Sequence, residues 1–387
     1  MHNNMIIEKR FDCCGVCEST VIELLSFPEF PFAGKFTKEA YKQPEYIAEL
    51  SLGICNKCNH LQLLTIADPD VLYTKGYTYR TSKSFLADSN QKTFLNFIKE
   101  IFLEEFPVVL DIGCNDLSLL NVMSEYAGYR IGIDPIQSDY IDTQNKIEVH
   151  GKYVEKINWN DFQEKPNLII SRHNIEHILD TRNYFEILRK NIDDSTLLVF
   201  EFPDAEAMIN NLRYDQLFHQ HVHYFTHDSF TQLVNLSGFK VVGSKYNAKM
   251  WGGSWIIAFK KGDETSSVRR LNDTLIVNNY KQFKSKNFII DNYLTQCPDV
   301  YGYGAGQMTP ILAYHLPSKL SSIEAIIDDD PEKDGTYFDY IKPKIVNSIQ
   351  IDLASATVFI TSVDAAATIT KNITARKVIL PNILLTM

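Results

Sequence analysis

The chain has 387 residues, of which 45% are hydrophobic and 22% charged, and its formal net charge is -10 at pH 7. This length predicts two or three domains with separate cores, and the acidic balance excludes a broad surface for nucleic acid or anionic membrane. No apolar run approaches the roughly 18 residues of a membrane span and the N-terminus lacks the order of a signal peptide, so we expect a cytoplasmic protein, monomeric or a small homo-oligomer.

Five of the seven cysteines lie near the N-terminus, in the segments "CCGVC" and "CNKC". Two C-x-x-C pairs can close a tetrahedral thiolate shell around zinc, whereas disulfides are disfavoured in a reducing cytosol. We therefore expect a small zinc-binding domain over residues 1–72 with a closed, structural site. Cys13 could replace the first cysteine of the first pair, because its spacing is also tolerable for a ligand. The expected zinc ligands are Cys14, Cys17, Cys55 and Cys58.

Residues 107–136, "PVVLDIGCNDLSLLNVMSEYAGYRIGIDPI", have the pattern of a βαβ unit. A buried strand is followed by a glycine turn, a helix with apolar periodicity and a second buried strand that ends at Asp134. An acidic residue at that distance from the turn can accept hydrogen bonds from ribose hydroxyls. The unit therefore predicts a ligand that contains adenosine.

The turn of this unit indicates which ligand it binds. A dinucleotide pyrophosphate needs several glycines, but only Gly113 is present, and Asn115 and Asp116 fill other places. A carboxylate at Asp116 would repel phosphate and suits the cationic S-adenosylmethionine (SAM), whose amine Asp111 could orient. The polar turn after the next strand is expected beside the same ligand. The expected SAM-binding residues are Asp111, Gly113, Asn115, Asp116, Asp134, His173 and Asn174.

The remaining segments predict an α/β sheet and two further parts. Two extended segments joined around Gly252 and Gly253 suit the antiparallel end of a methyltransferase sheet, which gives a SAM-binding domain over 73–261. Residues 262–294 are polar and helix-capable, and we expect them to form a connector. Residues 295–387 contain a strand, a glycine-rich turn and a helix, as in a Rossmann-like domain. That turn, with the acidic run 328–330, leaves an NAD-dependent enzyme as an alternative.

Motifs along nearly the whole chain resemble the three-domain sugar C-methyltransferases. These are the paired cysteine motifs followed by "HLQL", then "YTYRTS", "DIGCND", "NIEHILD", "FHQHVHYFT", "WGGS" and "YGYGAG" followed by "IIDDDPEKDG". The resemblance implies an N-terminal zinc domain, a class I SAM-dependent methyltransferase core and a C-terminal Rossmann-like domain. It also implies methyl transfer to a ring carbon beside the ketone of a nucleotide-linked deoxy-keto-sugar, held between the core and the C-terminal domain.

The resemblance also implies roles for particular side chains. His221 stands at the last histidine of the family's Tyr-His-Glu-His stretch and is expected to be the general base that forms an enolate. His177 is expected near the ketone, and Tyr77 or Tyr79 could donate to the sugar. The remaining histidines of "FHQHVHYFTH" are expected to be loop or packing residues. A metal site there is not expected, because no carboxylate or cysteine cluster accompanies the histidines in the sequence.

Several positions depart from the family pattern. Phe218 and Gln220 replace Tyr and Glu, Ile256 replaces an Arg, and Leu117 replaces a Gly of the cofactor turn. Gln307 or Met308 stands where a Lys is expected. Gln220 keeps a place beside the base but can only hydrogen-bond. These departures leave open methyl transfer to oxygen or nitrogen, and also a catalytically inactive protein that binds sugar nucleotides.

Overall fold

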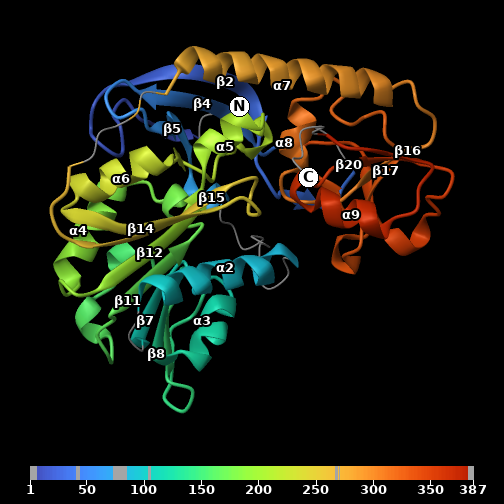
Figure 1. The fold of residues 1–387 in the computed structure, drawn as a ribbon. Coiled ribbons are helices and arrows are strands. Elements are labelled where there is room, and N and C mark those ends of the chain that lie inside the picture. The colour runs from blue at the N-terminus through green and yellow to red at the C-terminus, as the bar shows by residue number, and fades with distance from the viewer. Residues whose placement is uncertain are drawn as a thin grey trace.

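The computed structural model describes residues 7–40, 44–72, 85–102, 106–265, 269 and 271–381. Figure 1 shows a large central α/β sheet, an N-terminal β-sheet above it and a C-terminal α/β part beside it, with one long helix lying across the top. Among the helices in these ranges, none combines the length and apolar character that a bilayer crossing requires.

The N-terminal sheet is antiparallel and has the strand order β13-β5-β4-β2. A short antiparallel pair, β1 with β6, lies beside it, and β6 is followed by α1. Strand β13 comes from the histidine-rich segment more than 150 residues later, so this sheet crosses the expected limit at residue 72. The elements are β1 (Ile7–Arg10), β2 (Val21–Pro31), β4 (Ile47–Cys55), β5 (Leu61–Leu63), β6 (Thr65–Ala67), α1 (Pro69–Leu72) and β13 (His223–Tyr224).

The central sheet has eight strands in the order β14-β15-β12-β11-β7-β8-β10-β9. The strands from β12 to β10 in this order run parallel, while β9, β14 and β15 pair antiparallel, which confirms the expected hairpin around the two glycines. The parallel strands are continuous apolar runs because helices cover both of their faces. The strands are β7 (Phe106–Ile112), β8 (Ala127–Ile133), β9 (Tyr140–Asp142), β10 (Ile147–His150), β11 (Leu168–Arg172), β12 (Leu197–Pro203), β14 (Phe239–Asn247) and β15 (Ser254–Lys261).

Helices on opposite faces of this sheet bury separate apolar clusters. Phe94 and Ile98 of α2 pack with Val109 and Ile170 on one face, and Phe185 of α4 packs with aromatic residues of β12 and α6 on the other. The helix predicted after Gly113 is short, because it ends at Val122 and continues only as one 3-10 turn. The helices are α2 (Phe85–Ile101), α3 (Ser118–Val122), α4 (Thr181–Asn191), α5 (Ala205–Asn210) and α6 (His227–Leu236).

The C-terminal sheet is mixed and has the order β21-β20-β16-β17-β19-β18-β3. Its first five strands in this order are parallel, as expected for a Rossmann-like unit, whereas β18 and the N-terminal strand β3 are antiparallel. Its elements are β3 (Phe36–Thr37), β16 (Val300–Tyr303), α8 (Thr309–Tyr314), β17 (Ala325–Asp328), β18 (Tyr337–Phe338), β19 (Lys344–Asn347), β20 (Thr357–Ile360), α9 (Ala366–Asn372) and β21 (Lys377–Ile379).

Helix α7 (Asp273–Leu294) is the long helix at the top of Figure 1. Its N-cap Asn272 accepts a hydrogen bond from the backbone N–H of Leu275, which satisfies one of the helix's otherwise unpaired donors. Ile276 and Phe283 pack into the core of the N-terminal sheet, and Leu294 packs into the C-terminal core. The helix therefore joins two cores by burying different stretches of its length.

Candidate functional site

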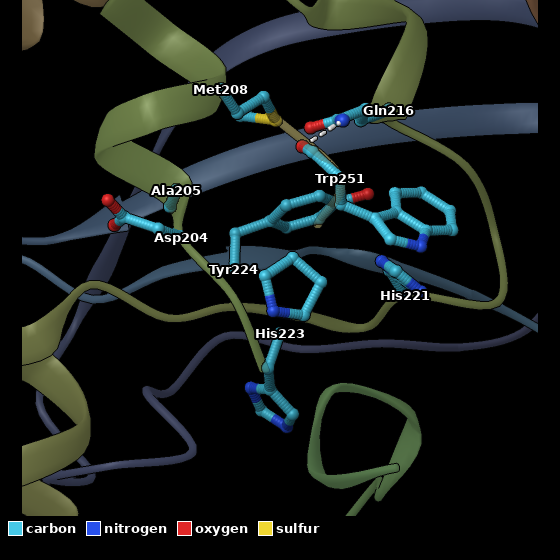
Figure 2. A pocket seen from close by; sticks show the side chains of 9 residues that line it. Asp204, Ala205, Met208, Gln216, His221, His223, Tyr224 and Trp251 are labelled. Atoms are coloured by element: carbon cyan, nitrogen blue, oxygen red, sulfur yellow. Dashed lines mark hydrogen bonds between the residues drawn. The ribbon is translucent and has the colours of Figure 1, made fainter. Parts of the chain in front are cut away.

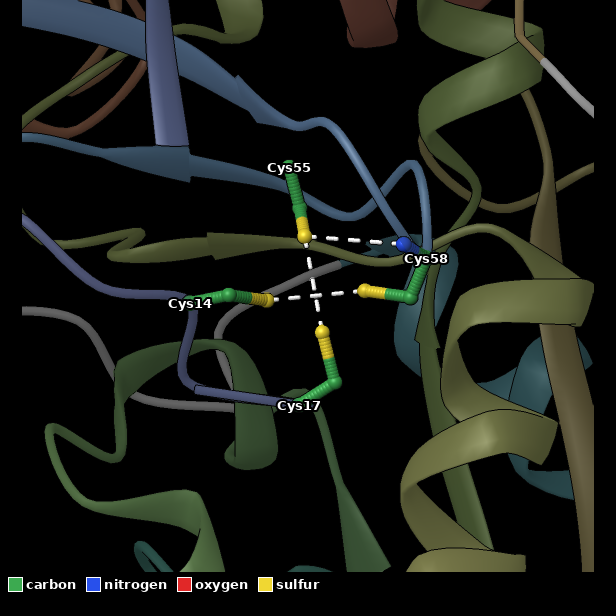
Figure 3. A group of neighbouring side chains, drawn as sticks. All are labelled: Cys14, Cys17, Cys55 and Cys58. Carbon is green, nitrogen blue, oxygen red and sulfur yellow. Dashed lines mark hydrogen bonds between the residues drawn. The ribbon is translucent and has the colours of Figure 1, made fainter. Parts of the chain in front are cut away.

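Four cysteines from the two C-x-x-C pairs lie together at the base of the N-terminal sheet. Figure 3 shows their sulfur atoms turned toward one another. Cys14 Sγ lies 3.5 Å from Cys58 Sγ, and Cys17 Sγ lies 3.5 Å from Cys55 Sγ. All four ligand atoms fall within 4.8 Å of one another. Cys13 is exposed and outside this group, so the structure selects Cys14.

The chemistry of the four thiols fits a zinc ion. Contact with neighbouring thiols and burial raise the pKa of Cys58, so four thiolates at this separation require a cation to hold their charge. Backbone N–H groups already point at the sulfurs, since Val16 donates to Cys14 Sγ at 3.4 Å and Lys57 to Cys55 Sγ at 3.4 Å. The arrangement is a four-cysteine cluster consistent with zinc.

The residues expected to bind SAM gather at the carboxyl ends of β7, β8 and β11. Gly113 has a φ of 84°, and a Cβ there would lie 2.8 Å from Asn174 Cγ, so the turn and the end of β11 are in contact. Asp134 follows β8, and its Oδ2 accepts the Asn115 N–H at 2.8 Å. Because glycine has no Cβ, the backbone of this turn can approach a ligand closely, as a cofactor turn in such a sheet requires.

The carboxylates at this edge differ in their surroundings. Asp111 is 3% exposed, and burial raises its pKa to about 7, with Asp134 adding to the rise and Arg172 opposing it. Asp134 uses its second oxygen to accept the Ile136 N–H at 3.0 Å. Asp116 accepts the Ser118 N–H at 3.3 Å at the start of α3.

A small pocket beside this edge is lined by His221 and aromatic residues (Figure 2). Gln216 at its rim donates to the Trp251 carbonyl at 2.6 Å, which fixes the loop that carries the indole. The lining residues are Pro203, Asp204, Ala205, Met208, Gln216, His221, His223, Tyr224 and Trp251.

His221 is enclosed by rings. Its centroid lies 4.1 Å from that of Phe218, 5.5 Å from Trp251 and 4.7 Å from His177. Burial lowers the pKa of His221 well below its ordinary value, and His177 and His173 lower it further. The imidazole is therefore neutral at physiological pH, which is the form that accepts a proton.

The segment after β11 connects the pocket to the cofactor edge. Asn174 contacts Gly113, while His177 contacts His221 from the 3-10 turn that follows, Ile175–His177. His177 Nδ1 lies 2.8 Å from the backbone oxygen of Gln220, and because a carbonyl only accepts, Nδ1 carries the proton. Gln220 thus contributes its main chain to the geometry of the pair.

Glu176 is a carboxylate that the sequence interpretation overlooked. It is 1% exposed, and its Oε1 lies 3.5 Å from His173 Nδ1 and 3.9 Å from His221 Nε2. The expectation that no carboxylate accompanies the histidines is wrong, because the chain folds the turn after β11 against the histidine segment. Together Glu176, His177 and His221 bring ligand-type atoms within 4.8 Å. Its place in "NIEHILD", next to a predicted site histidine, was the available signal.

The other histidines of the cluster have different surroundings. His219 is buried against Phe32, with ring centroids 4.5 Å apart, and His223 Nδ1 lies 2.9 Å from His60 Nε2. His227 is half-buried against Trp255 in a separate surface pocket. His219 therefore packs in the interior, His223 is hydrogen-bonded to His60 and lines the pocket, and His227 lies at the surface.

The positions that depart from the family pattern have different surroundings. Ile256 is fully buried in β15, where the expected arginine would have no solvent, and the Phe218 ring lies 4.1 Å from that of His221, the expected base, at an interplanar angle of 41°. Leu117 is the N-cap residue of α3, with a φ of 65°, and the Gln307 backbone oxygen accepts the Gly34 N–H at 2.9 Å. Tyr77 and Tyr79 lie outside the described residues.

Residues 85–244 match a family model described as "Methyltransferase domain", and residues 14–73 match one described as "Putative zinc binding domain". The chain carries a methyltransferase domain preceded by a zinc-binding-type domain. The expected class I SAM-dependent methyltransferase fold is confirmed, with the N-terminal four-cysteine domain and a separate C-terminal mixed sheet. For this domain, the expected enzyme class, a SAM-dependent methyltransferase, is confirmed as well.

Similar proteins include a named C-methyltransferase. NovU from Streptomyces niveus is 24% identical over 265 residues, which are 65% of this chain and 61% of NovU. Among solved structures, the N-methyltransferase NodS from Bradyrhizobium japonicum WM9 is 12% identical with a TM-score of 0.34, covering 47% of this chain and 99% of NodS. A SAM-dependent methyltransferase from Clostridium acetobutylicum ATCC 824 is 11% identical with a TM-score of 0.36, covering 47% of this chain and 96% of its own. The match spans less than two thirds of the length of NovU.

Proposed function

We propose that this protein transfers a methyl group from SAM to a carbon beside the ketone of a nucleotide-linked deoxy-keto-sugar. The observation that carries the proposal is the enclosed, neutral His221 in a pocket that residues 173–177 connect to the cofactor edge. The named activity of NovU, a C-methyltransferase, supports carbon as the acceptor.

Each group of residues has a distinct part in this proposal. SAM supplies an electrophilic methyl group when it is bound. Asp134 can accept bonds from ribose hydroxyls, and Asp111, once ionised, can hold an ammonium group. His221 takes the proton beside the ketone and leaves an enolate on the sugar. Trp251, which lines the pocket, and Phe218, which packs against both Trp251 and His221, exclude water from that carbanion-like centre.

Product analysis tests this proposal. The protein is offered SAM and a panel of nucleotide-linked deoxysugars, with and without the keto group, in heavy water, and the products are identified by mass spectrometry. Methyl transfer to keto-sugars only, with deuterium exchange at the neighbouring carbon, is expected. A methylated hydroxyl or amine without exchange at carbon would overturn carbon as the acceptor, and no product from any sugar would overturn the sugar substrate.

The C-terminal glycine turn argues against the dinucleotide alternative. Asp328, the residue placed for a ribose, already accepts the Ala305 N–H at 2.7 Å, and Lys333 Nζ lies 3.1 Å from each of its oxygens. The carboxylate is therefore neutralised from within the domain. Calorimetry with SAM and with NADH separates the two functions, and binding of NADH without SAM would reverse our assignment.

A further inference from the structure

The carboxylate of Glu176 is held in the interior without the bonds that such a group normally makes. Within the described part of the chain no hydrogen bond reaches either oxygen, although the side chain is 1% exposed. Its main chain is engaged, since the Glu176 carbonyl accepts the Val222 N–H at 2.8 Å. A buried carboxylate without a hydrogen-bond donor is energetically unfavourable. Its position therefore implies that a cationic group pairs with it during the reaction.

We propose that Glu176 is the positioning residue of the general base, holding His221 and stabilising the positive charge that its imidazole gains. This inference rests on the proposed function. Glu176 Oε1 lies 3.9 Å from His221 Nε2, within ion-pair range. The pattern that the sequence resembles has a glutamate at position 220, where this chain has Gln220. Glu176, on the facing turn, therefore supplies the charge that an amide cannot.

Among the residues that the structure describes, the other groups around His221 do not supply a closer negative charge. His177 and His173 are bases themselves and oppose its protonation, and the Tyr224 ring lies 6.3 Å away. Asp204 lines the same pocket, but its oxygens accept the N–H groups of Glu206 and Ala207 at the start of α5. Glu176 is thus the anion placed to pair with the imidazolium.

The reaction step balances with these residues. A ring nitrogen of His221 takes the proton beside the ketone, and the C–H electron pair enters the enolate. The enolate carbon then bonds to the methyl carbon, whose bond to sulfur breaks with the pair staying on sulfur. His221 returns its proton to water. Since Nε2 faces Glu176, we assign the proton on the neutral ring to Nε2 and the substrate proton to Nδ1.

The central variant is Glu176→Gln, which keeps the shape of the side chain and removes its charge. We expect kcat to fall about 10- to 100-fold, part of the range that general-base catalysis supplies, with KM and SAM affinity nearly unchanged. The acid limb of the pH profile of kcat/KM should move about one pH unit lower, because the anion that favours the protonated imidazole is gone. Glu176→Asp keeps the charge and should retain most of kcat.

A second pair of variants tests whether charge, rather than position 176 alone, is what matters. Gln220→Glu in the Glu176→Gln background should recover part of the lost kcat, because it restores a carboxylate near the ring. The matched control is Glu148→Gln, which alters another buried carboxylate, 0% exposed, that accepts from Tyr129 Oη at 3.2 Å. This control should lower stability and leave kcat and the pH profile unchanged.

A substrate-independent measurement separates this inference from the proposed function. Nitrogen-15 NMR of the free protein should show His221 protonated at Nε2 in the parent and a changed tautomer population in Glu176→Gln. If no sugar is methylated but this change is seen, the positioning contact stands and the proposed function falls. Unchanged ring signals, kcat and pH profile in Glu176→Gln would overturn the inference. So would a second equivalent of a divalent metal, besides zinc, that Glu176→Gln loses, because the cluster would then be a metal site.

Discussion

The enclosure of the His221 ring determines its protonation state. Three aromatic or imidazole rings lie within 5.5 Å of its centroid, and burial keeps it neutral. A neutral imidazole is available as a base at physiological pH without first losing a proton. The same enclosure makes its protonated form unfavourable, so the surrounding residues decide how strong a base it is.

Replacing His221 by Asn keeps a polar group of similar reach but removes the base. We expect turnover to fall about 10²- to 10⁴-fold, the usual contribution of a positioned proton acceptor, while calorimetry shows unchanged SAM affinity. His227→Asn, in the separate surface pocket, is the matched control and should keep parental turnover. Parental turnover in His221→Asn would exclude this residue as the base.

Gly113 is a position where the backbone itself requires the residue type. Its φ of 84° and the 2.8 Å approach of Asn174 Cγ to an added Cβ make Gly113→Ala both strained and crowded. We expect at least a tenfold loss of SAM affinity, roughly 1.4 kcal/mol. Gly243→Ala is the control, because the added Cβ would come no closer than 3.4 Å to a neighbouring atom. This variant should bind SAM with the parental affinity. Equal affinities in calorimetry would show that the turn does not contact the cofactor.

Asp111 should make SAM binding depend on pH. Its pKa of about 7 means that the carboxyl is mostly neutral below that pH and ionised above it, whereas an α-amino group keeps most of its positive charge until its own pKa of about 7.7–8.0. Affinity should therefore rise between pH 6 and about pH 7.5, as measured by calorimetry. Asp111→Asn should bind more weakly at pH 8 and lose this dependence. A pH dependence that persists in the variant would assign it to another group.

At the level of elements, the sequence predicted those whose signal is local. The sequence alone indicates the strands β7, β11 and β12, because each is a short continuous run of apolar residues. It likewise indicates the two C-x-x-C pairs, because the cysteines of each pair are only three positions apart. Strand β13 has two residues, and its pairing with β5 depends on a partner far away in the chain. Glu176 was missed for the same reason, because only the folded turn places it against the histidines.

The four-cysteine cluster should support the elements that it joins. Thr181 at the start of α4 donates to the Gly15 carbonyl at 2.7 Å, so the first cysteine pair is bonded to the central domain. Cys58→Ser should lose zinc and unfold at lower temperature, because metal binding energy contributes to folding. Cys13→Ser, outside the cluster, should keep one zinc per chain in elemental analysis and the parental melting temperature. Retained zinc in Cys58→Ser would contradict the ligand assignment.

At the level of the whole molecule, a buried arginine joins the central and C-terminal parts. Arg213 is 4% exposed, donates to both oxygens of Asp215, and reaches Asp364 Oδ1 of the C-terminal domain at 3.0 Å. Arg213→Leu leaves Asp215 buried without its partner, which should lower the free energy of unfolding by about 3–5 kcal/mol. We expect a clearly lower urea midpoint. Asp364→Asn, at the half-exposed partner, should lower the midpoint less. An unchanged midpoint in Arg213→Leu would show that Arg213 does not stabilise the contact between the two parts.

The pairing of β13 with β5 has a consequence for how such chains can be recombined. The strand that follows the proposed base belongs to the sheet of the N-terminal domain, so a fragment that starts after residue 72 would lack the partner of His223 and Tyr224. A chimera that takes the N-terminal domain from a relative would have to take the segment around residues 218–224 with it. The segments that must be exchanged together to keep this site are therefore two separate stretches of the chain rather than one continuous domain.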